Sequence, residues 1–370
     1  MAASDVAVPA ERPPRSSVGL IGWLYGNLFS SWSNAALTLI GMFIAYYALS
    51  GIIEWGLIRA TFSGSDGSAC TRVNAGACWP YVGAKFGQFM YGRYPEEERW
   101  RVDLVYLLAL AGLIPLMIPS LPGKFWNAIY VFAIFPVIAF FLLLGGAFGL
   151  TPVDTALWGG LLVTLVVATV GITGSVPIGI ILALGRRSRM PIVRWVSVGF
   201  IEFVRGVPLI TVLFMASVML PLFLPPGITF DKLLRALIGV ALFDAAYLAE
   251  TVRGGLQAIP RGQFEAADAL GLSYTKKMAL IVLPQALKLV VPGIVGNFIG
   301  LFKNTSLVQI IGLFDLLGII QLNNADVKWF SQATTKTGYV FAGLVFWIFC
   351  YGMSRYSQMI ERRLAAGERR

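Results

Sequence analysis

The sequence contains no histidine among its 370 residues. Histidine is the most frequent general base and metal ligand in proteins, so its absence argues against Ser-His-Asp hydrolysis and zinc chemistry. Only three cysteines are present, and none lies in a C-x2-C pair of the kind that binds zinc. We therefore expect no catalytic residues, no metal site and no enzymatic activity.

Charged residues are also scarce, at 13% of the chain, whereas a soluble protein carries about a quarter. Hydrophobic residues make up 57% of the sequence, and the mean hydropathy is +0.74. This balance predicts a membrane protein. The formal net charge is +10, which is compatible with nucleic-acid binding, anionic lipid or basic cytoplasmic loops, and the positions of the charges decide among them.

Eight stretches approach or exceed the roughly 20 apolar residues that a membrane-spanning helix needs. We predict an all-α polytopic membrane protein with about eight transmembrane helices. They cover residues 37–58, 103–119, 127–148, 157–184, 197–223, 234–256, 284–303 and 338–358.

The orientation of these spans follows from lysine and arginine in the short loops, which favour the cytoplasm. The densest cluster lies between the fourth and fifth spans and consists of Arg186, Arg187, Arg189 and Arg194. Alternation from this loop places Lys276, Lys277 and both termini on the cytoplasmic side. The basic excess is thus explained by topology alone. Membrane lipid is an expected partner, and nucleic acid is not.

The N-terminal half predicts a tail and an extension. Residues 1–30 are expected to form a cytoplasmic tail, disordered over the first twenty, and residues 31–154 a transmembrane extension with a periplasmic loop at 59–102. That loop contains Cys70 and Cys78. They either form a disulfide in an oxidising compartment or remain free thiols.

The C-terminal half differs because its apolar spans contain charged residues, among them Glu202, Arg205, Asp244 and Glu250. Ionisable groups inside a membrane are costly and usually functional. We expect residues 155–362 to form the working core and residues 363–370 a cytoplasmic tail.

A motif lies in the predicted cytoplasmic loop 257–283, between the sixth and seventh spans. The loop contains residues of small bulk that favour a helix. They are followed by Gly271, which favours a helix end, and later by Pro284, which favours a helix start. A helix of this kind can lie close against a partner. The residues of the motif are Gly262, Gln263, Glu265, Ala266, Ala267, Gly271, Ile281, Leu283 and Pro284.

The spacing of this motif, E-A-A, Gly, then I-x-L-P, resembles the coupling-helix loop of binding-protein-dependent ABC importer permeases. The resemblance implies a five-helix permease core in the bacterial inner membrane. It also implies a cytoplasmic ABC ATPase dimer, a periplasmic amino-acid-binding protein and a second, related permease subunit, a heterodimer being favoured over a homodimer.

Three further strings resemble the polar amino-acid branch of that family. Residues 202–209 resemble E-x-x-R-G-T-P-L, with Val207 in the place of the threonine. Residues 246–255 resemble A-Y-x-x-E-x-x-R-G-G, and residues 303–307 resemble K-(D/N)-T-S-L. The additional N-terminal spans resemble those of general L-amino-acid and glutamate/glutamine permease subunits.

No G-x-x-x-x-G-K-[ST] string occurs in the sequence, so the chain lacks the loop that cradles nucleotide phosphates. We expect no cofactor to be bound by this chain and ATP to be hydrolysed by a partner subunit.

Several residues are candidates for the substrate pathway. Glu202 and Arg205 are spaced to pair with each other or to face substrate. Asp244 meets either the ammonium group of an amino acid or an interhelical cation such as Arg205, whereas Glu250 and Arg253 favour a structural pair. The full set comprises Glu202, Arg205, Asp244, Tyr247, Asn297, Lys303, Asn304, Thr305 and Ser306.

An alternative function is an ion-coupled secondary amino-acid transporter, with Glu202 and Asp244 as proton sites. Such folds contain inverted repeats with paired broken helices, which the sequence does not reveal. The coupling loop would also have no purpose there. The ABC permease is therefore the favoured prediction.

Overall fold

The computed structural model describes residues 19–118, 120–225, 227 and 230–368, and this part of the chain is almost entirely helical. The predicted all-α class is confirmed, with one two-residue strand, β1 (Phe314–Asp315). The α-helices are α1 (Gly19–Leu28), α2 (Trp32–Ile53), α3 (Trp79–Tyr91), α4 (Arg99–Met117), α5 (Lys124–Ile129), α6 (Phe135–Leu144), α7 (Gly160–Arg186), α8 (Pro191–Gly206), α9 (Leu209–Phe214), α10 (Lys232–Ala258), α11 (Arg261–Ala269), α12 (Tyr274–Lys277), α13 (Leu283–Asn304), α14 (Leu316–Asn323) and α15 (Gln332–Glu368).

The predicted terminal tails are only partly described. Residues 1–18 lie outside the described residues, whereas the remainder of the predicted N-terminal tail contains α1. At the other end, α15 continues through most of the predicted C-terminal tail, as far as Glu368.

Six helical segments in the described chain are long and apolar enough to cross a membrane, and a bent pair of helices gives a seventh. The sixth predicted span, at 234–256, corresponds to α10, which has the length of a span at 27 residues but carries four charged side chains beyond its first residue. The predicted number of about eight is therefore approximate. The six are Trp32–Ile58, Glu96–Met117, Lys124–Leu144, Gly160–Arg186, Tyr274–Ile311 and Gln332–Leu364, and the bent pair is Pro191–Gly206 with Leu209–Phe223.

The fifth predicted span, at 197–223, is not one helix. It breaks between α8 and α9, and the segments Pro191–Gly206 and Leu209–Phe223 are bent by 106°. Pro208 disfavours the helical conformation in the residue before it, and Val207 accordingly has extended backbone angles, with φ −107° and ψ 134°. The predicted single helix is therefore two helices, because apolar length alone does not reveal the break at Pro208.

The seventh predicted span begins earlier than expected. The helix starts at Tyr274, contains a π-helical turn at Met278–Val282, and continues as α13. Pro284 therefore lies inside a long helix rather than at its first turn. Because proline offers no N–H to the preceding turn, the irregular π-helical register just before it accommodates the missing hydrogen bond.

The core of the bundle is the contact of α10 with α7 and α13. A Cβ added to Gly179 of α7 would lie 2.9 Å from the Leu248 Cβ of α10. A Cβ added to Gly255 of α10 would lie 2.6 Å from the Ala286 carbonyl oxygen of α13. Small residues let the three helix backbones approach closely, so these helices pack tightly against one another.

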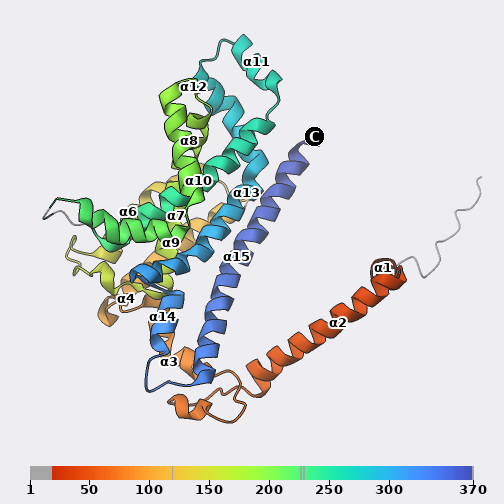
Figure 1. Cartoon of the computed structure of the whole chain (residues 1–370), viewed down its shortest axis with the longest axis vertical. Coiled ribbons are helices and arrows are strands. Elements are labelled where there is room, and N and C mark those ends of the chain that lie inside the picture. The colour runs from red at the N-terminus through yellow and green to blue at the C-terminus, as the bar shows by residue number, and fades with distance from the viewer. Residues whose placement is uncertain (1–18, 119, 226, 228–229, 369–370) are drawn as a thin grey trace, which may run out of the picture.

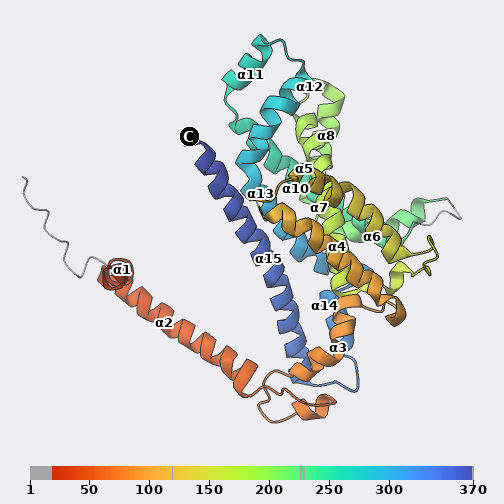
Figure 2. The same ribbon diagram turned by 180° about the vertical axis from the view of Figure 1, so that it is seen from behind.

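Helix α2 stands apart from this bundle. Both views show it extending away from the other helices (Figures 1 and 2), and none of its residues is buried. Its apolar residues surround the helix on all sides, as expected for a helix in contact with lipid.

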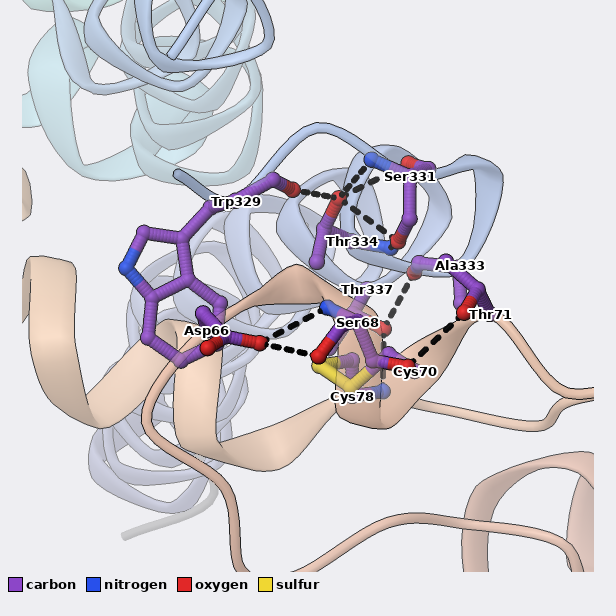
Figure 3. Close-up of a disulfide and its surroundings, with 10 residues drawn as sticks. All are labelled: Asp66, Ser68, Cys70, Thr71, Cys78, Trp329, Ser331, Ala333, Thr334 and Thr337. Carbon is purple, nitrogen blue, oxygen red and sulfur yellow. Dashed lines mark hydrogen bonds between the residues drawn. A yellow bond between two sulfur atoms is a disulfide. The ribbon is translucent and has the colours of Figure 1, made fainter. Parts of the chain in front are cut away.

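The predicted polar loop 59–102 contains regular structure, including α3. We call residues 61–91 the disulfide lobe. Within it Cys70 and Cys78 form a disulfide with a Cα separation of 5.8 Å (Figure 3). The Gly67 N–H donates to the Lys328 carbonyl at 2.8 Å, and the Cys78 N–H donates to Thr337 Oγ1 at 2.8 Å. The lobe is thereby fixed to the start of α15, at the end of the molecule opposite α11 (Figure 1).

Candidate functional site

The predicted coupling residues form a projecting arm, defined here as residues 261–271. Helix α11 begins after Pro260 and ends at Gly271, whose φ of +69° is left-handed. The N–H of Gly271 donates to the Asp268 carbonyl at 2.9 Å, and the N–H of Leu272 donates to the Ala267 carbonyl at 3.2 Å. These bonds satisfy carbonyls that a helix end leaves free. The helix end predicted at Gly271 is confirmed.

The arm has one buried contact and an exposed outer surface. Ala267 is fully buried, whereas Gly262, Gln263, Glu265 and Ala266 are exposed. A small side chain at the buried position lets the helix lie close to the bundle. The other four residues are free to contact a second protein.

A cavity of about 410 Å³ lies beneath the arm. Arg187, which follows α7, and Phe264 and Glu265 of the arm contribute to its lining. The Arg187 guanidinium lies 5.7 Å from the centroid of the Phe264 ring and donates to the Leu256 carbonyl at 2.8 Å. Arg187 therefore connects the arm to the ends of α7 and α10.

The second half of the motif lies on the helix that follows the arm. Ile281 and Leu283 are half-buried, whereas Pro284 is exposed. The Gln285 amide donates to Gln263 Oε1 at 3.1 Å and to the Ile281 carbonyl at 2.9 Å. The two helical segments are thus cross-linked by a side-chain hydrogen bond.

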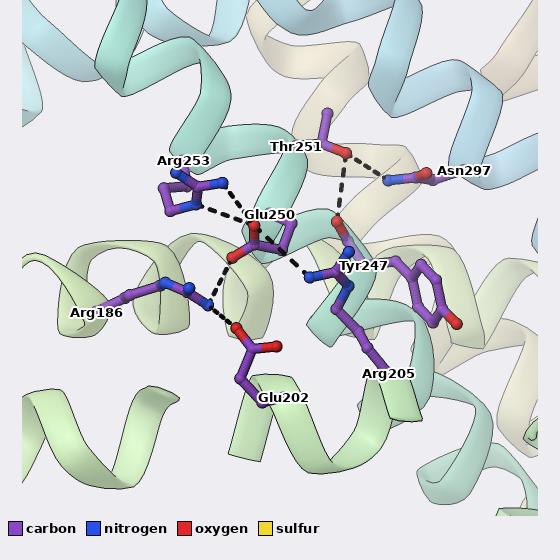
Figure 4. A network of polar contacts seen from close by, with 8 residues as sticks. All are labelled: Arg186, Glu202, Arg205, Tyr247, Glu250, Thr251, Arg253 and Asn297. Carbon is purple, nitrogen blue, oxygen red and sulfur yellow. Dashed lines mark hydrogen bonds and ion pairs between the residues drawn. The ribbon is translucent and has the colours of Figure 1, made fainter. Parts of the chain in front are cut away.

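Five charged residues form a network where α7, α8 and α10 meet (Figure 4). Arg186 lies 2.7 Å from Glu202 and 2.8 Å from Glu250. Glu250 also contacts Arg253 at 2.8 Å and Arg205 at 3.7 Å. Glu250 is the least exposed member, with 15% of its side chain accessible. It is the centre of the network because it meets all three arginines.

Of the two alternatives for Glu202 and Arg205, the local pair with each other does not form. Each contacts a residue of another helix instead: Glu202 contacts Arg186, and Arg205 contacts Glu250. The third arginine, Arg253, does pair with Glu250 three residues earlier on the same helix. Helical spacing made both local pairs possible, but the approach of α7 offered Glu202 a closer cation.

The structure brings two further pathway candidates to this region. Arg205 lies 5.8 Å from the centroid of the Tyr247 ring. The Asn297 amide donates to Thr251 Oγ1 at 3.0 Å, and Thr251 in turn donates to the Tyr247 carbonyl at 3.3 Å. Asn297 therefore joins α13 to α10 beside the network (Figure 4).

Asp244 does not belong to this group. It is 6% exposed, and its Oδ2 has no hydrogen-bond partner within the described residues. The suggested interhelical cation, Arg205, contacts Glu250. No described lysine or arginine lies within 4.0 Å of the Asp244 carboxylate.

The four candidates at the end of α13 have local contacts. Thr305 is fully buried and donates to the Phe302 carbonyl at 2.8 Å, and Ser306 donates to the Lys303 carbonyl at 3.0 Å. Both hydroxyls satisfy carbonyls at the helix end. Lys303 itself is exposed, and Asn304 is half-buried.

Sequence reasoning missed Arg186 and Arg187 as members of these sites. Both were assigned to a loop that fixes topology. The available signal was their position at the end of a long span, where the side chains can reach neighbouring helices.

Residues 175–366 match the family model described as binding-protein-dependent transport system inner membrane component. The chain belongs to this family. Its members are permease subunits of ABC transporters, so the chain is a membrane subunit without catalytic function of its own, and the family implies an ATPase and a binding protein as partners. The secondary-transporter alternative finds no support.

Relatives extend this similarity over the whole length. The chain is 52% identical over 364 residues to the inner membrane amino-acid ABC transporter permease protein YhdY of Escherichia coli, covering 96% of this chain and 97% of the relative. It is 39% identical over 429 residues to the glutamate/glutamine/aspartate/asparagine transport system permease protein BztC of Rhodobacter capsulatus, covering 97% of each. A solved amino acid ABC transporter with histidines matches with 28% identity and a TM-score of 0.48, covering 55% of this chain and 92% of that one.

Proposed function

We propose that this chain carries polar L-amino acids through the bacterial inner membrane as the permease subunit of an ATP-driven importer. The observation that supports the substrate class is the full-length similarity to two permeases named for amino acids. The chain itself would bind no nucleotide. Uptake of radiolabelled glutamate, glutamine and maltose by cells expressing the complete system tests the proposal. Uptake of the amino acids alone is expected, and uptake of maltose alone would exclude this substrate class.

The α11 arm is proposed as the contact with the ATPase. Its exposed surface, with the carboxylate of Glu265, offers a charged hydrogen-bond acceptor to an arginine of the partner. A cysteine at Glu265 should cross-link to the ATPase. The matched control is a cysteine at Val327, which is 92% exposed at the opposite end, and both variants carry Cys350→Ser to remove the free thiol.

The same two variants test the orientation. We propose that both termini and the arm face the cytoplasm and that the disulfide lobe faces the periplasm. A membrane-impermeant maleimide added to intact cells should label Val327→Cys and leave Glu265→Cys unlabelled until the membrane is opened. Labelling of Glu265→Cys in intact cells would show that the orientation is the reverse of the one proposed.

The substrate pathway is proposed to pass beside the charged network. Three arginines face two glutamates there, which leaves one positive charge in excess. Arg205 has the longest contact, 3.7 Å, and 36% of its side chain is exposed. It is therefore the guanidinium most available to a substrate carboxylate, with Tyr247 and Asn297 nearby. Asp244, Lys303, Asn304, Thr305 and Ser306 remain candidates elsewhere along the pathway.

Substitution of Arg205 tests this assignment. Arg205→Gln should lower uptake at low glutamate concentration more than at saturation, because it removes a binding contact. The control is Arg194→Gln, which replaces an exposed arginine on the same helix. It should change uptake neither at low glutamate nor at saturation. Equal losses of uptake in both variants would mean that the effect comes from the lower overall positive charge and not from a contact of Arg205 with substrate.

The second permease subunit is proposed to be a related but different chain. The N-terminal extension favours an asymmetric pair, since the family match begins only at residue 175. Two differently tagged copies of this chain, expressed with the rest of the system, should not purify together. Their joint purification would indicate a homodimer.

A further inference from the structure

The last membrane helix presents a continuous exposed face that changes character along its length. Trp347 and Tyr351 are stacked, with ring centroids 5.1 Å apart and planes inclined by 18°. Aromatic residues of this kind mark the boundary between hydrocarbon and headgroups. The exposed apolar residues of this face, at helical spacings of three and four, are Leu344, Trp347, Ile348 and Tyr351.

Beyond Tyr351 the same face becomes cationic. Arg355 follows one turn later, and Arg362 lies two further turns along the helix. Both side chains are exposed. The face thus passes from apolar to aromatic to basic in the order of the layers of a membrane leaflet.

These arginines do not simply extend into open solvent, because they border a cavity of about 620 Å³. Met117, at the end of α4, also contributes to its lining, and the other lining residues belong to α15. The cavity therefore has apolar and basic surfaces, which α15 supplies together with the last residue of α4. Its main lining residues are Met117, Arg355, Tyr356, Met359, Arg362 and Arg363.

The positive charge of the cavity is not neutralised by the described chain. Arg355 contacts the neutral Gln358 amide oxygen at 3.3 Å. No described carboxylate lies within 4.0 Å of Arg355, Arg362 or Arg363. Glu361, on the same helix, accepts a hydrogen bond from Ser357 instead.

The end of α4 does not supply the missing negative charge either. Its last carbonyls carry partial negative charge and would attract a nearby arginine. Lys124 already occupies them: its ammonium group donates to the carbonyls of Pro115, Leu116 and Ile118. An external anion is thus the available partner for the arginines.

We propose that this cavity binds the headgroup of an anionic phospholipid, with the acyl chains lying along the apolar face of α15. Guanidinium groups bind phosphate oxygens through paired hydrogen bonds, and basic pockets between membrane helices suit acidic headgroups. An acidic protein surface would satisfy the arginines but not the exposed aromatic and aliphatic residues that lead to them. An amphiphile satisfies both. The inference needs only a membrane-embedded chain and does not depend on the transported substrate.

The test compares two double variants that remove equal charge. Arg355→Gln with Arg362→Gln alters the cavity, whereas Arg189→Gln with Arg194→Gln removes two exposed arginines from the α7–α8 loop and α8. Purified complexes are titrated with phosphatidylglycerol in mixed micelles, and bound lipid is counted by native mass spectrometry. A basic residue contributes roughly fivefold to affinity near an anionic headgroup, so the cavity variant should bind about thirtyfold more weakly. The control should change by less than about twofold.

Three other outcomes would contradict the proposed lipid site. Equal loss in both variants would mean that the lipid responds only to overall charge, and no loss in either would mean that the cavity is not occupied by this lipid. Displacement of phosphatidylglycerol by an equal concentration of glycerol 3-phosphate would point to a free phosphate ester as ligand. Arg355→Lys with Arg362→Lys keeps the charge and should retain binding partially, which separates loss of the site from misfolding.

Discussion

Arg186 and Glu250 lie 2.8 Å apart, and this contact joins the end of α7 to α10 at the point where α8 also meets them. Glu202 of α8 contacts the same arginine at 2.7 Å. One guanidinium therefore holds two carboxylates from different helices. Because a sharp bend separates α8 from α9, this contact ties α8 directly to α7 and α10.

Glu250→Gln should destabilise the protein more than Glu202→Gln. Glu250 meets three arginines and has 15% of its side chain exposed, so its loss leaves half-buried positive charges close together. We expect a cost of about 2 kcal/mol for Glu250→Gln. Glu202 is 54% exposed, and the screened pair contributes about 0.5 kcal/mol. Thermal unfolding of the purified complexes measures the difference. A larger effect at Glu202 would mean that Glu250 is not the centre of the network.

The sequence predicted the positions of the helices in the C-terminal half better than the bends and contacts between them. Apolar length located α7 and α13, and Gly271 was correctly assigned to a helix end. The bend at Pro208 was missed because the residues on both sides are apolar. Arg186 was missed because its partners come from helices that are distant in the sequence, and no local spacing encodes that contact.

The disulfide lobe shows the same limit. The polar stretch and its cysteines were recognised, but not α3 or the docking of the lobe on α15. That docking depends on backbone bonds, such as Gly67 to Lys328, and on a buried threonine, Thr337. Backbone groups carry no sequence signature, so a tertiary contact made through them is invisible to pattern analysis.

Cys70→Ser with Cys78→Ser should loosen the disulfide lobe without disturbing the membrane bundle. The bridge closes a loop with a sequence separation of 8, for which chain entropy predicts a loss of about 2.5 kcal/mol. Hydrogen exchange should rise in residues 61–78 and remain unchanged in α10. Cys350→Ser is the control, because this thiol is not bridged. Unchanged exchange in the lobe would show that its contacts with α15 suffice without the bridge.

Acidification should also loosen the lobe, through Asp326. The Lys85 ammonium bonded to it, together with the Lys328 N–H, holds the Asp326 pKa below its usual 3.8. As the pH falls through 3.8, the unfolded state therefore binds more protons than the folded one, and the stabilisation is lost as the pH reaches the lowered pKa. Protease resistance of the lobe should decline below that pH. Asp326→Asn should lower the resistance at neutral pH and make this decline smaller.

The stability contributed by Asp315 should change with pH in the opposite direction to that contributed by Asp326. Burial raises its pKa to about 6, although the N–H groups of Gly318 and Leu317 oppose the shift. Stability from this residue is present below pH 3.8 and is lost as the pH rises towards 6. The Asp326 effect must therefore be measured as the difference between wild type and Asp326→Asn. If that difference does not change with pH, the Lys85 contact contributes nothing to the lobe.

Gly271→Val should detach the ATPase while the membrane bundle stays folded. A Cβ at this position would meet no atom within 4 Å, so the substitution creates no clash, but the φ of +69° is unfavourable for a β-branched residue. The strain, on the order of 1–2 kcal/mol, is relieved if α11 changes its end geometry, which misplaces Glu265. We expect normal membrane insertion, loss of ATPase co-purification and loss of uptake.

Gly271→Asn and Gly271→Asp separate backbone geometry from charge at the same site. Both residues tolerate left-handed angles better than valine, so each should preserve the end of α11. Asparagine should therefore keep ATPase association and uptake. Aspartate, nearly identical in shape, adds a negative charge to the exposed arm and should weaken association to a degree that depends on salt. If valine retains full association and transport, the arm does not couple this subunit to its ATPase.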